Sequence, residues 1–230
     1  MGKRAFDLFF SAIGIVLLSP VLLVLAVLVK LSDGGSVFFR QIRVGQAGGR
    51  FSMLKFRSMV PNAAGLGPGI TKDGDPRITG IGRFLRKTKL DELPQLWNVF
   101  RGEMSFVGPR PELPVYVAKY TAEQKRVLEL RPGITDLATL EFQNEEELLS
   151  LAVDGLPTRQ SADAVERFYI EYCLPRKIEL NLAYANRASV WEDTKLILRT
   201  VRALVSRQPA QDTTQRPTLR GVSEVAEKGH

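Results

Sequence analysis

The stretch LFFSAIGIVLLSPVLLVLAVLV, from Leu8 to Val29, carries no charged residue and determines the organisation of the chain. A helix rises by about 1.5 Å per residue, so a helix of this length could span a lipid bilayer. The run is longer than the apolar region of a signal peptide, Asp7 interrupts its entry, and no A-x-A cleavage site follows it. The sequence therefore predicts a membrane element in residues 1–32.

Two features leave the topology of this element open. Ser19-Pro20 lies at the middle of the run, where proline removes a backbone donor and favours a kink or a break. Basic residues flank both ends, so the positive-inside rule gives no preferred direction. A re-entrant helix broken at Ser19-Pro20 would keep both basic ends on the cytoplasmic side. A proline-kinked spanning helix is the alternative.

The composition excludes several kinds of chemistry. Cys173 is the only cysteine and His230, the last residue, is the only histidine of 230 residues. Zinc sites built from Cys and His, and nucleophilic triads with a histidine base, are therefore not expected. The chain has 32 Lys and Arg against 25 Asp and Glu, a net charge of +7, which attracts anions such as phosphorylated metabolites, nucleic acid or an anionic membrane.

Residues 37–44 and 51–57 are β-prone runs separated by GQAGGR, a pattern that predicts a hairpin. Lys55 and Arg57, two residues apart, would then lie on one face of the second strand. They could bind a phosphate together. Equally, they could form a solvated basic edge that prevents strand pairing.

Helical patterns follow at residues 78–89, 93–101, 114–130, 162–172 and 189–206. The last is amphipathic and basic, so we expect it to lie on an anionic bilayer or to pack on the core. Residues 207–230 are polar, carry two prolines and lack aromatic residues, which predicts a disordered tail. The sequence thus predicts an α+β, mostly helical fold with a small β-hairpin, amphipathic surface helices and one domain at residues 33–206.

Adjacent carboxylates occur in Lys89-Leu-Asp-Glu-Leu-Pro-Gln-Leu-Trp-Asn98. Because proline is best tolerated in a first helical turn, Asp91 and Glu92 are expected at or just before a helix start, where free amides also attract phosphate. Consecutive helical residues point about 100° apart, so one acid could act as a nucleophile while the other holds a metal. Acids in a first turn are also ordinary stabilising residues, which is the plainer explanation.

Several cations surround this pair in the sequence. Prolines on both sides of Arg110 stiffen its backbone and suit it to phosphate binding. Arg86 lies just upstream of the acids, and Arg131 lies beside a turn. Taken together with the membrane element and the lack of any histidine except His230, they suggest transfer of a phosphate-bearing group at a membrane surface.

The ordered series of motifs resembles the monotopic bacterial phosphoglycosyl transferases, also called the bacterial sugar transferase family. The likeness covers most of residues 3–202. Besides Ser19-Pro20, it rests on these segments: Lys3-Arg-x-Phe-Asp7, Phe39-Arg-Gln-x-Arg-Val-Gly45, Lys55-Phe-Arg-Ser-Met59, Asp75-Pro-Arg77, Ile81-Gly-Arg-Phe-Leu-Arg86, Leu90-Asp-Glu-Leu-Pro-Gln-Leu96, Gly108-Pro-Arg-Pro111 and Arg131-Pro-Gly-Ile-Thr135.

The resemblance implies transfer of a sugar 1-phosphate from a nucleoside diphosphate sugar, usually a UDP-sugar, to polyprenol phosphate at the cytoplasmic face of the bacterial inner membrane. It favours the re-entrant helix, embedded in inner-membrane lipid, and a catalytic domain at residues 33–206. It implies that Asp91 forms a covalent phosphosugar intermediate and that Glu92 binds Mg²⁺. By the same resemblance, the candidate phosphate-binding residues are Lys55, Arg57, Arg86, Arg110 and Arg131.

The chain departs from the family after Thr135. Many members continue with Gly and an Ala-Gln-Val-Asn-Gly-Arg run, whereas this chain reads Asp136-Leu-Ala-Thr-Leu-Glu-Phe-Gln-Asn-Glu-Glu-Glu. The alternative function is a non-catalytic, membrane-anchored basic scaffold that binds anionic lipid or nucleic acid. That alternative leaves the two acids among the cations unexplained, and no nucleic-acid-binding module is recognisable, so we expect no nucleic-acid partner.

Overall fold

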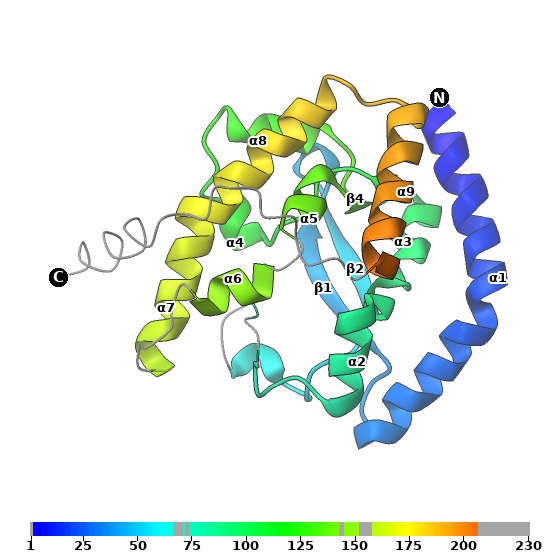
Figure 1. The fold of residues 1–230 in the computed structure, drawn as a ribbon, viewed down its shortest axis with the longest axis vertical. Coiled ribbons are helices and arrows are strands. Elements are labelled where there is room, and N and C mark those ends of the chain that lie inside the picture. The colour runs from blue at the N-terminus through cyan, green and yellow to red at the C-terminus, as the bar shows by residue number, and fades with distance from the viewer. Residues whose placement is uncertain (1, 67–70, 72–73, 143–144, 152–157, 207–230) are drawn as a thin grey trace.

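A computed structural model describes residues 2–66, 71, 74–142, 145–151 and 158–206. The described residues form the expected α+β, mostly helical fold (Figure 1). The predicted tail at 207–230 lies outside them. The helices and strands, in chain order, are α1 Gly2–Asp33, β1 Phe38–Val44, β2 Arg50–Phe56, α2 Gly80–Thr88, α3 Gln95–Arg101, β3 Ser105–Val107, α4 Pro114–Val117, β4 Gly133–Thr135, α5 Leu137–Glu141, α6 Glu145–Leu151, α7 Thr158–Phe168, α8 Leu174–Ala185 and α9 Val190–Ser206.

The membrane element is one helix, α1, so the predicted break at Ser19-Pro20 is not present. Pro20 lacks the N–H that would bond to the carbonyl of Val16, four residues earlier. The Ser19 hydroxyl donates to that same carbonyl at 2.7 Å. The side chain thus satisfies the orphaned acceptor, and the helix curves without breaking (Figure 1).

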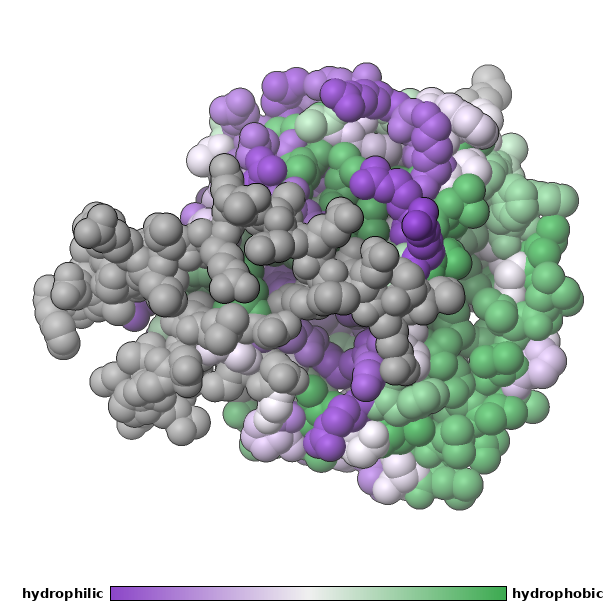
Figure 2. All heavy atoms as spheres, viewed as in Figure 1, coloured by the Kyte–Doolittle hydropathy of each residue, from purple (hydrophilic) through white to green (hydrophobic). Residues whose placement is uncertain are grey.

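Both ends of α1 are attached to the rest of the fold. At its start, Asp7 is 1% exposed and accepts hydrogen bonds from the Ser105 hydroxyl and the Phe106 amide, each at 3.1 Å. Near its end, Leu25 and Val29 pack in a buried cluster. Its other apolar side chains are largely exposed, and they form the hydrophobic side of the molecule in Figure 2.

The predicted β-hairpin is confirmed, with each strand within one residue of its expected position. β1 and β2 pair antiparallel from Phe38 opposite Phe56 to Val44 opposite Arg50. A tight turn joins them, in which Ala47 has a φ of 54°. The hairpin places Lys55 on the strand that lies against the segment of the two acids.

A second pair of strands, which the sequence patterns do not reveal, brings distant segments together. β3 and β4 run parallel, with Ser105 opposite Gly133. A Cβ at Gly108 would meet the Arg131 carbonyl at 2.1 Å, and one at Gly133 would meet the Gly108 nitrogen at 2.1 Å. Both positions therefore need glycine, and the close approach sets the segment after β3 beside the segment after β4.

The helix predicted over 114–130 is wrong. α4 ends at Val117, and a separate 3-10 helix covers Gln124–Glu129. Thr121 and Gln124 explain the interruption, because the Gln124 amide donates to the Thr121 hydroxyl and the Thr121 amide donates to the Gln124 side chain. This reciprocal capping box starts a new turn at Thr121.

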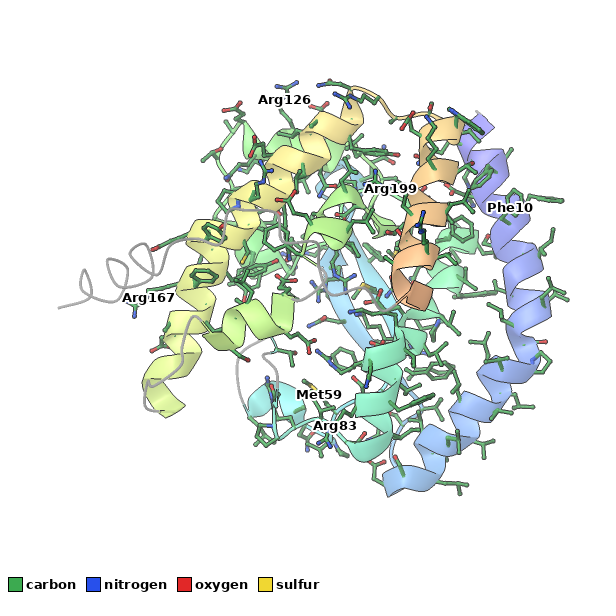
Figure 3. The ribbon with its side chains drawn as sticks, in the orientation of Figure 1. Phe10, Met59, Arg83, Arg126, Arg167 and Arg199 are labelled. Atoms are coloured by element: carbon green, nitrogen blue, oxygen red, sulfur yellow. The ribbon has the colours of Figure 1, made fainter. Side chains whose placement is uncertain are left out.

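The other predicted helices are confirmed with shifted ends, and α5, α6 and α8 are additional. α7 runs through a π-helical turn at Tyr169–Cys173 into α8, which has Pro175 in its first turn, where proline is tolerated. α9 packs on the core through Leu196, which is 4% exposed, and lies next to α1. Arg199, labelled in Figure 3, is on α9.

Candidate active site

The two acids lie where the sequence predicts them, just before a helix start. α2 ends at Thr88, and the next residue, Lys89, adopts the left-handed conformation with a φ of 57°. A single 3-10 turn, Leu90–Glu92, follows and leads through Pro94 into α3. The short turn holds Asp91 and Glu92 between α2 and α3, facing the hairpin and the segment after β3.

Glu92 is held between two cations. Its Oε1 accepts hydrogen bonds from the Lys55 ammonium at 2.8 Å and from an Arg110 guanidinium nitrogen at 2.6 Å. Burial alone would raise the pKa of Glu92, but the charges of Arg110 and Lys55 outweigh burial and hold that pKa well below its usual range. Glu92 is therefore ionised at neutral pH, and its charge in turn raises the pKa of Arg110.

Asp91 has a different environment from its neighbour. Asp91 is 5% exposed, and no residue that the structure describes donates a hydrogen bond to its carboxylate, whose oxygens are not fully buried. Burial raises the pKa of Asp91, and the charge of Glu92 adds to the rise, whereas Lys55 and Arg86 oppose it. A buried carboxylate without hydrogen-bond donors is more basic than a solvated one, as expected of a group held ready for chemistry.

Arg110 is positioned by groups that sequence reasoning did not single out. Its backbone amide donates to Asp136 Oδ2 at 3.1 Å, and the same oxygen accepts from the Asn181 side chain of α8 at 3.0 Å. Asp136 also caps α5 by accepting from the Thr139 amide. Asp136 is 1% exposed, so one buried carboxylate joins the Arg110 segment to two helices. An Asp before a helical run is a capping signal, but its partner across 26 residues is visible only in the structure.

A second buried carboxylate supports the same segment. Glu112, two residues after Arg110, accepts a hydrogen bond from the Tyr169 hydroxyl and lies 3.9 Å from the Arg43 guanidinium. Arg43 also donates to the Pro111 carbonyl at 3.0 Å. These contacts fix both sides of Arg110, and its guanidinium therefore approaches Glu92 from a rigid backbone.

Arg86 lies on α2 and reaches the acids through its charge, which lowers the pKa of Asp91. Its guanidinium forms an ion pair with Glu146 of α6. Among the residues described, its buried Nε has no hydrogen-bond partner.

The two remaining predicted phosphate ligands lie elsewhere. Arg57 follows the end of β2, and its guanidinium is bound by Asp33 at the end of α1 and by the Ser36 carbonyl. Lys55 and Arg57 therefore do not share one site. Arg131 lines a separate cavity of about 290 Å³ together with Lys3 at the start of α1. The structure thus brings Lys55, Arg86 and Arg110 to the acids and leaves Arg57 and Arg131 apart from them.

The acids could hold magnesium only with help from a substrate. No cluster of three or more His, Cys, Asp or Glu side chains suited to a metal occurs in the described part of the chain. Glu92 Oε2, however, accepts one long hydrogen bond, at 3.4 Å from Arg110, so this oxygen retains capacity for a ligand. Mg²⁺ commonly takes one or two carboxylates and completes its shell with water and substrate phosphates, and the residues present fit that pattern.

Comparison with known proteins identifies the family. The family model described as Bacterial sugar transferase matches residues 1–207, and the chain belongs to this family. It is 35% identical over 207 residues to the UDP-N-acetylgalactosamine-undecaprenyl-phosphate N-acetylgalactosaminephosphotransferase of Aeromonas hydrophila, covering 89% of this chain and 44% of that protein.

Other relatives are of more similar length. The UDP-glucose:undecaprenyl-phosphate glucose-1-phosphate transferase of Caulobacter vibrioides is 36% identical over 217 residues, which is 90% of this chain and 70% of that protein. The exopolysaccharide production protein ExoY of Rhizobium meliloti is 41% identical over 160 residues, covering 63% and 71%. The chain therefore spans less than half of the Aeromonas relative and about 70% of the other two.

Proposed function

We propose that this protein transfers a sugar 1-phosphate from a nucleoside diphosphate sugar, specifically a UDP-sugar, to polyprenol phosphate. Family membership supports the reaction class, and the names of two relatives give UDP-sugars as donors and undecaprenyl phosphate as acceptor. The product, a polyprenyl diphosphate sugar, starts the synthesis of a glycan such as an O-antigen, a capsule, an exopolysaccharide or a protein-linked glycan.

The observation that carries the mechanism is the contrast between the two acids. Asp91 is buried with no hydrogen-bond partner among the described residues, whereas Glu92 is locked between Lys55 and Arg110. A desolvated carboxylate beside cations suits a nucleophile that attacks phosphorus. If the protein were a non-catalytic scaffold, this carboxylate would have no function, and its burial would only lower the stability of the fold.

The transfer then proceeds in two displacements at one phosphorus atom. A carboxylate oxygen of Asp91 attacks the sugar-bearing phosphorus, the bond to the bridging oxygen breaks, and UMP leaves with the bonding electrons. An oxygen of polyprenol phosphate next attacks the same phosphorus. The bond to Asp91 breaks, its carboxylate is regenerated, and the sugar phosphate is joined to the lipid.

The surrounding charges stabilise these steps. Lys55, Arg86 and Arg110 offset the negative charge that the donor brings to the two acids. Glu92 would hold Mg²⁺ through Oε2, and the metal would supply further charge neutralisation on the phosphate oxygens. The proposal gives the protein a divalent metal requirement.

Although α1 is not broken at Ser19-Pro20, its attachment supports the topology of a re-entrant helix, with both ends at the cytoplasmic face of the bacterial inner membrane. A straight helix of this length spans about 48 Å at 1.5 Å per residue. Its first turns bond to β3 through Asp7, and its last turns pack under α2. Both ends therefore contact the same folded domain, and an apolar outer side remains for lipid (Figure 2). A helix that crossed the bilayer would carry one end away from that domain.

The test is UMP release from UDP-sugars by purified, detergent-solubilised protein with magnesium. Incubation with a donor alone, followed by intact-protein mass spectrometry, should show an added sugar-phosphate mass. Asp91→Asn should abolish both UMP release and the adduct. Asp163→Asn, at an exposed position of α7, is the matched control and should retain both. Strict dependence of UMP release on polyprenol phosphate would instead favour direct attack by the acceptor. No release from any UDP-sugar in a broad panel would refute the reaction class.

A further inference from the structure

α6 is a short helix seated in the core on one side and charged on the other. Leu149 is 1% exposed within the largest hydrophobic cluster, and Leu148 packs against that cluster. Glu145 and Glu146 project from the charged side. Asp136, earlier in the same acidic segment, positions Arg110, whereas these two glutamates have no part in the mechanism proposed above.

The two glutamates have different partners. Glu145 pairs with Lys177, a nearly buried ammonium on α8 that also stacks on Tyr169. Glu146 pairs with Arg86 of α2, sixty residues away in the chain. The side chains of Arg86 and Glu146 are 22% and 42% exposed, so this pair lies at the rim of the site and not in the core.

Arg86 has unused capacity toward a ligand. Its charge acts on the Asp91 carboxylate, and its buried Nε lacks a hydrogen-bond partner among the described residues. Guanidinium groups bind phosphate through two parallel hydrogen bonds, an arrangement they also form with carboxylates. The Glu146 carboxylate binds one guanidinium nitrogen of Arg86, and it therefore competes for this side chain with a phosphate bound at Asp91.

We propose that Glu146 is a positioning residue: its carboxylate holds the Arg86 guanidinium until the diphosphate of the donor takes the place of that carboxylate. This inference rests on the proposed function, because it places a sugar-linked diphosphate at Asp91. The incoming phosphates add negative charge beside Asp91 and Glu92, and Glu146 adds a further like charge at the rim. Exchange of one carboxylate for phosphate on Arg86 relieves that repulsion. Glu146 thereby sets how tightly the donor binds.

Glu146→Gln should strengthen donor binding. Removing the competing charge should lower KM for the UDP-sugar by about two- to fivefold, the range expected for a half-exposed ion pair, and leave kcat within about twofold. In an Arg86→Gln background the same change should have no effect on KM, because its partner is gone. Glu141→Gln is the matched control, since Glu141 forms a half-exposed ion pair with Arg176 away from the acids.

A binding measurement separates this inference from the proposed reaction. Titration calorimetry with inorganic pyrophosphate, on the full chain in detergent, should show tighter binding to Glu146→Gln than to wild type and unchanged binding to Glu141→Gln. Melting temperatures verify that each variant is folded. Weaker or equal pyrophosphate binding, or a raised or unchanged KM, overturns the role of Glu146. Lack of UMP release by wild type would refute the reaction, and the pyrophosphate result would still decide whether Glu146 competes for Arg86.

Discussion

Replacement of Glu92 by Gln tests whether the two cations are held by one carboxylate. At a helix start alone, loss of the charge would cost at most about 1 kcal/mol of dipole interaction. The structure gives a larger cost, because Lys55 and Arg110 both donate to Oε1 and all three side chains are at most 32% exposed. Removing one partner of a buried ion pair costs about 3–5 kcal/mol.

The expected destabilisation is smaller than that limit. Gln keeps an oxygen acceptor, and Arg110 is one-third exposed, so water screens part of its charge. We expect a loss of roughly 2–3 kcal/mol in the free energy of unfolding. For a chain of this size each kcal/mol lowers Tm by about 2–4 °C, which predicts a decrease of roughly 4–12 °C.

The pH dependence gives a second test of the same variant. The pKa of Glu92 lies well below 4.5 in the folded protein, so its stabilisation is complete above the unfolded value and is lost as pH falls toward the folded value. The difference in Tm between wild type and Glu92→Gln should therefore be largest near neutral pH and shrink in acid. Asp91 titrates in both proteins.

The assay is thermal unfolding in detergent, monitored by circular dichroism at neutral and at acid pH. Glu141→Gln, which neutralises a half-exposed pair, is the control and should shift Tm by much less. A decrease below about 2 °C for Glu92→Gln would mean that the contacts with Lys55 and Arg110 contribute no more than a surface charge. An equal decrease at neutral and acid pH would refute the charge argument.

Three further predictions concern metal, pH and topology. Excess EDTA should abolish UMP release and magnesium should restore it, whereas full turnover in EDTA would exclude a metal at the acids. Because burial raises the pKa of Asp91, the acid limb of the pH profile of kcat/KM should lie above the ordinary aspartate pKa. Lys55→Gln should move this limb to still higher pH, since the charge of Lys55 lowers the pKa of Asp91. An acid limb at or below pH 3.8 would contradict this prediction. In a Cys173→Ser background, cysteines at the exposed positions Gly2 and Ser36 should both be protected from a membrane-impermeant thiol reagent in intact cells, and labelling of either from the periplasm would rule out the re-entrant helix.

Features that depend on residues close together in the sequence could be predicted from the sequence. The uncharged run of α1, the hairpin around GQAGGR and the placement of Asp91 and Glu92 before α3 follow from hydrophobic patterning and turn chemistry. The helix expected over 114–130 fails for a local reason, the capping box at Thr121. At Pro20 the Ser19 hydroxyl satisfies the carbonyl of Val16 within a continuous α1, and hydrophobic patterning does not show this bond.

The composition of the site depends on contacts across the chain. Lys55 and Arg57 have the same charge and lie two residues apart, yet Lys55 meets Glu92 and Arg57 meets Asp33. Local sequence cannot decide this, because each partner comes from a segment placed by packing: the turn between α2 and α3 for Glu92, and the end of α1 for Asp33. The residue types alone determine that the site uses carboxylates and cations. Tertiary structure alone decides which cation pairs with which carboxylate and which acid is left without a hydrogen-bond partner. Burial and the distances between segments determine both.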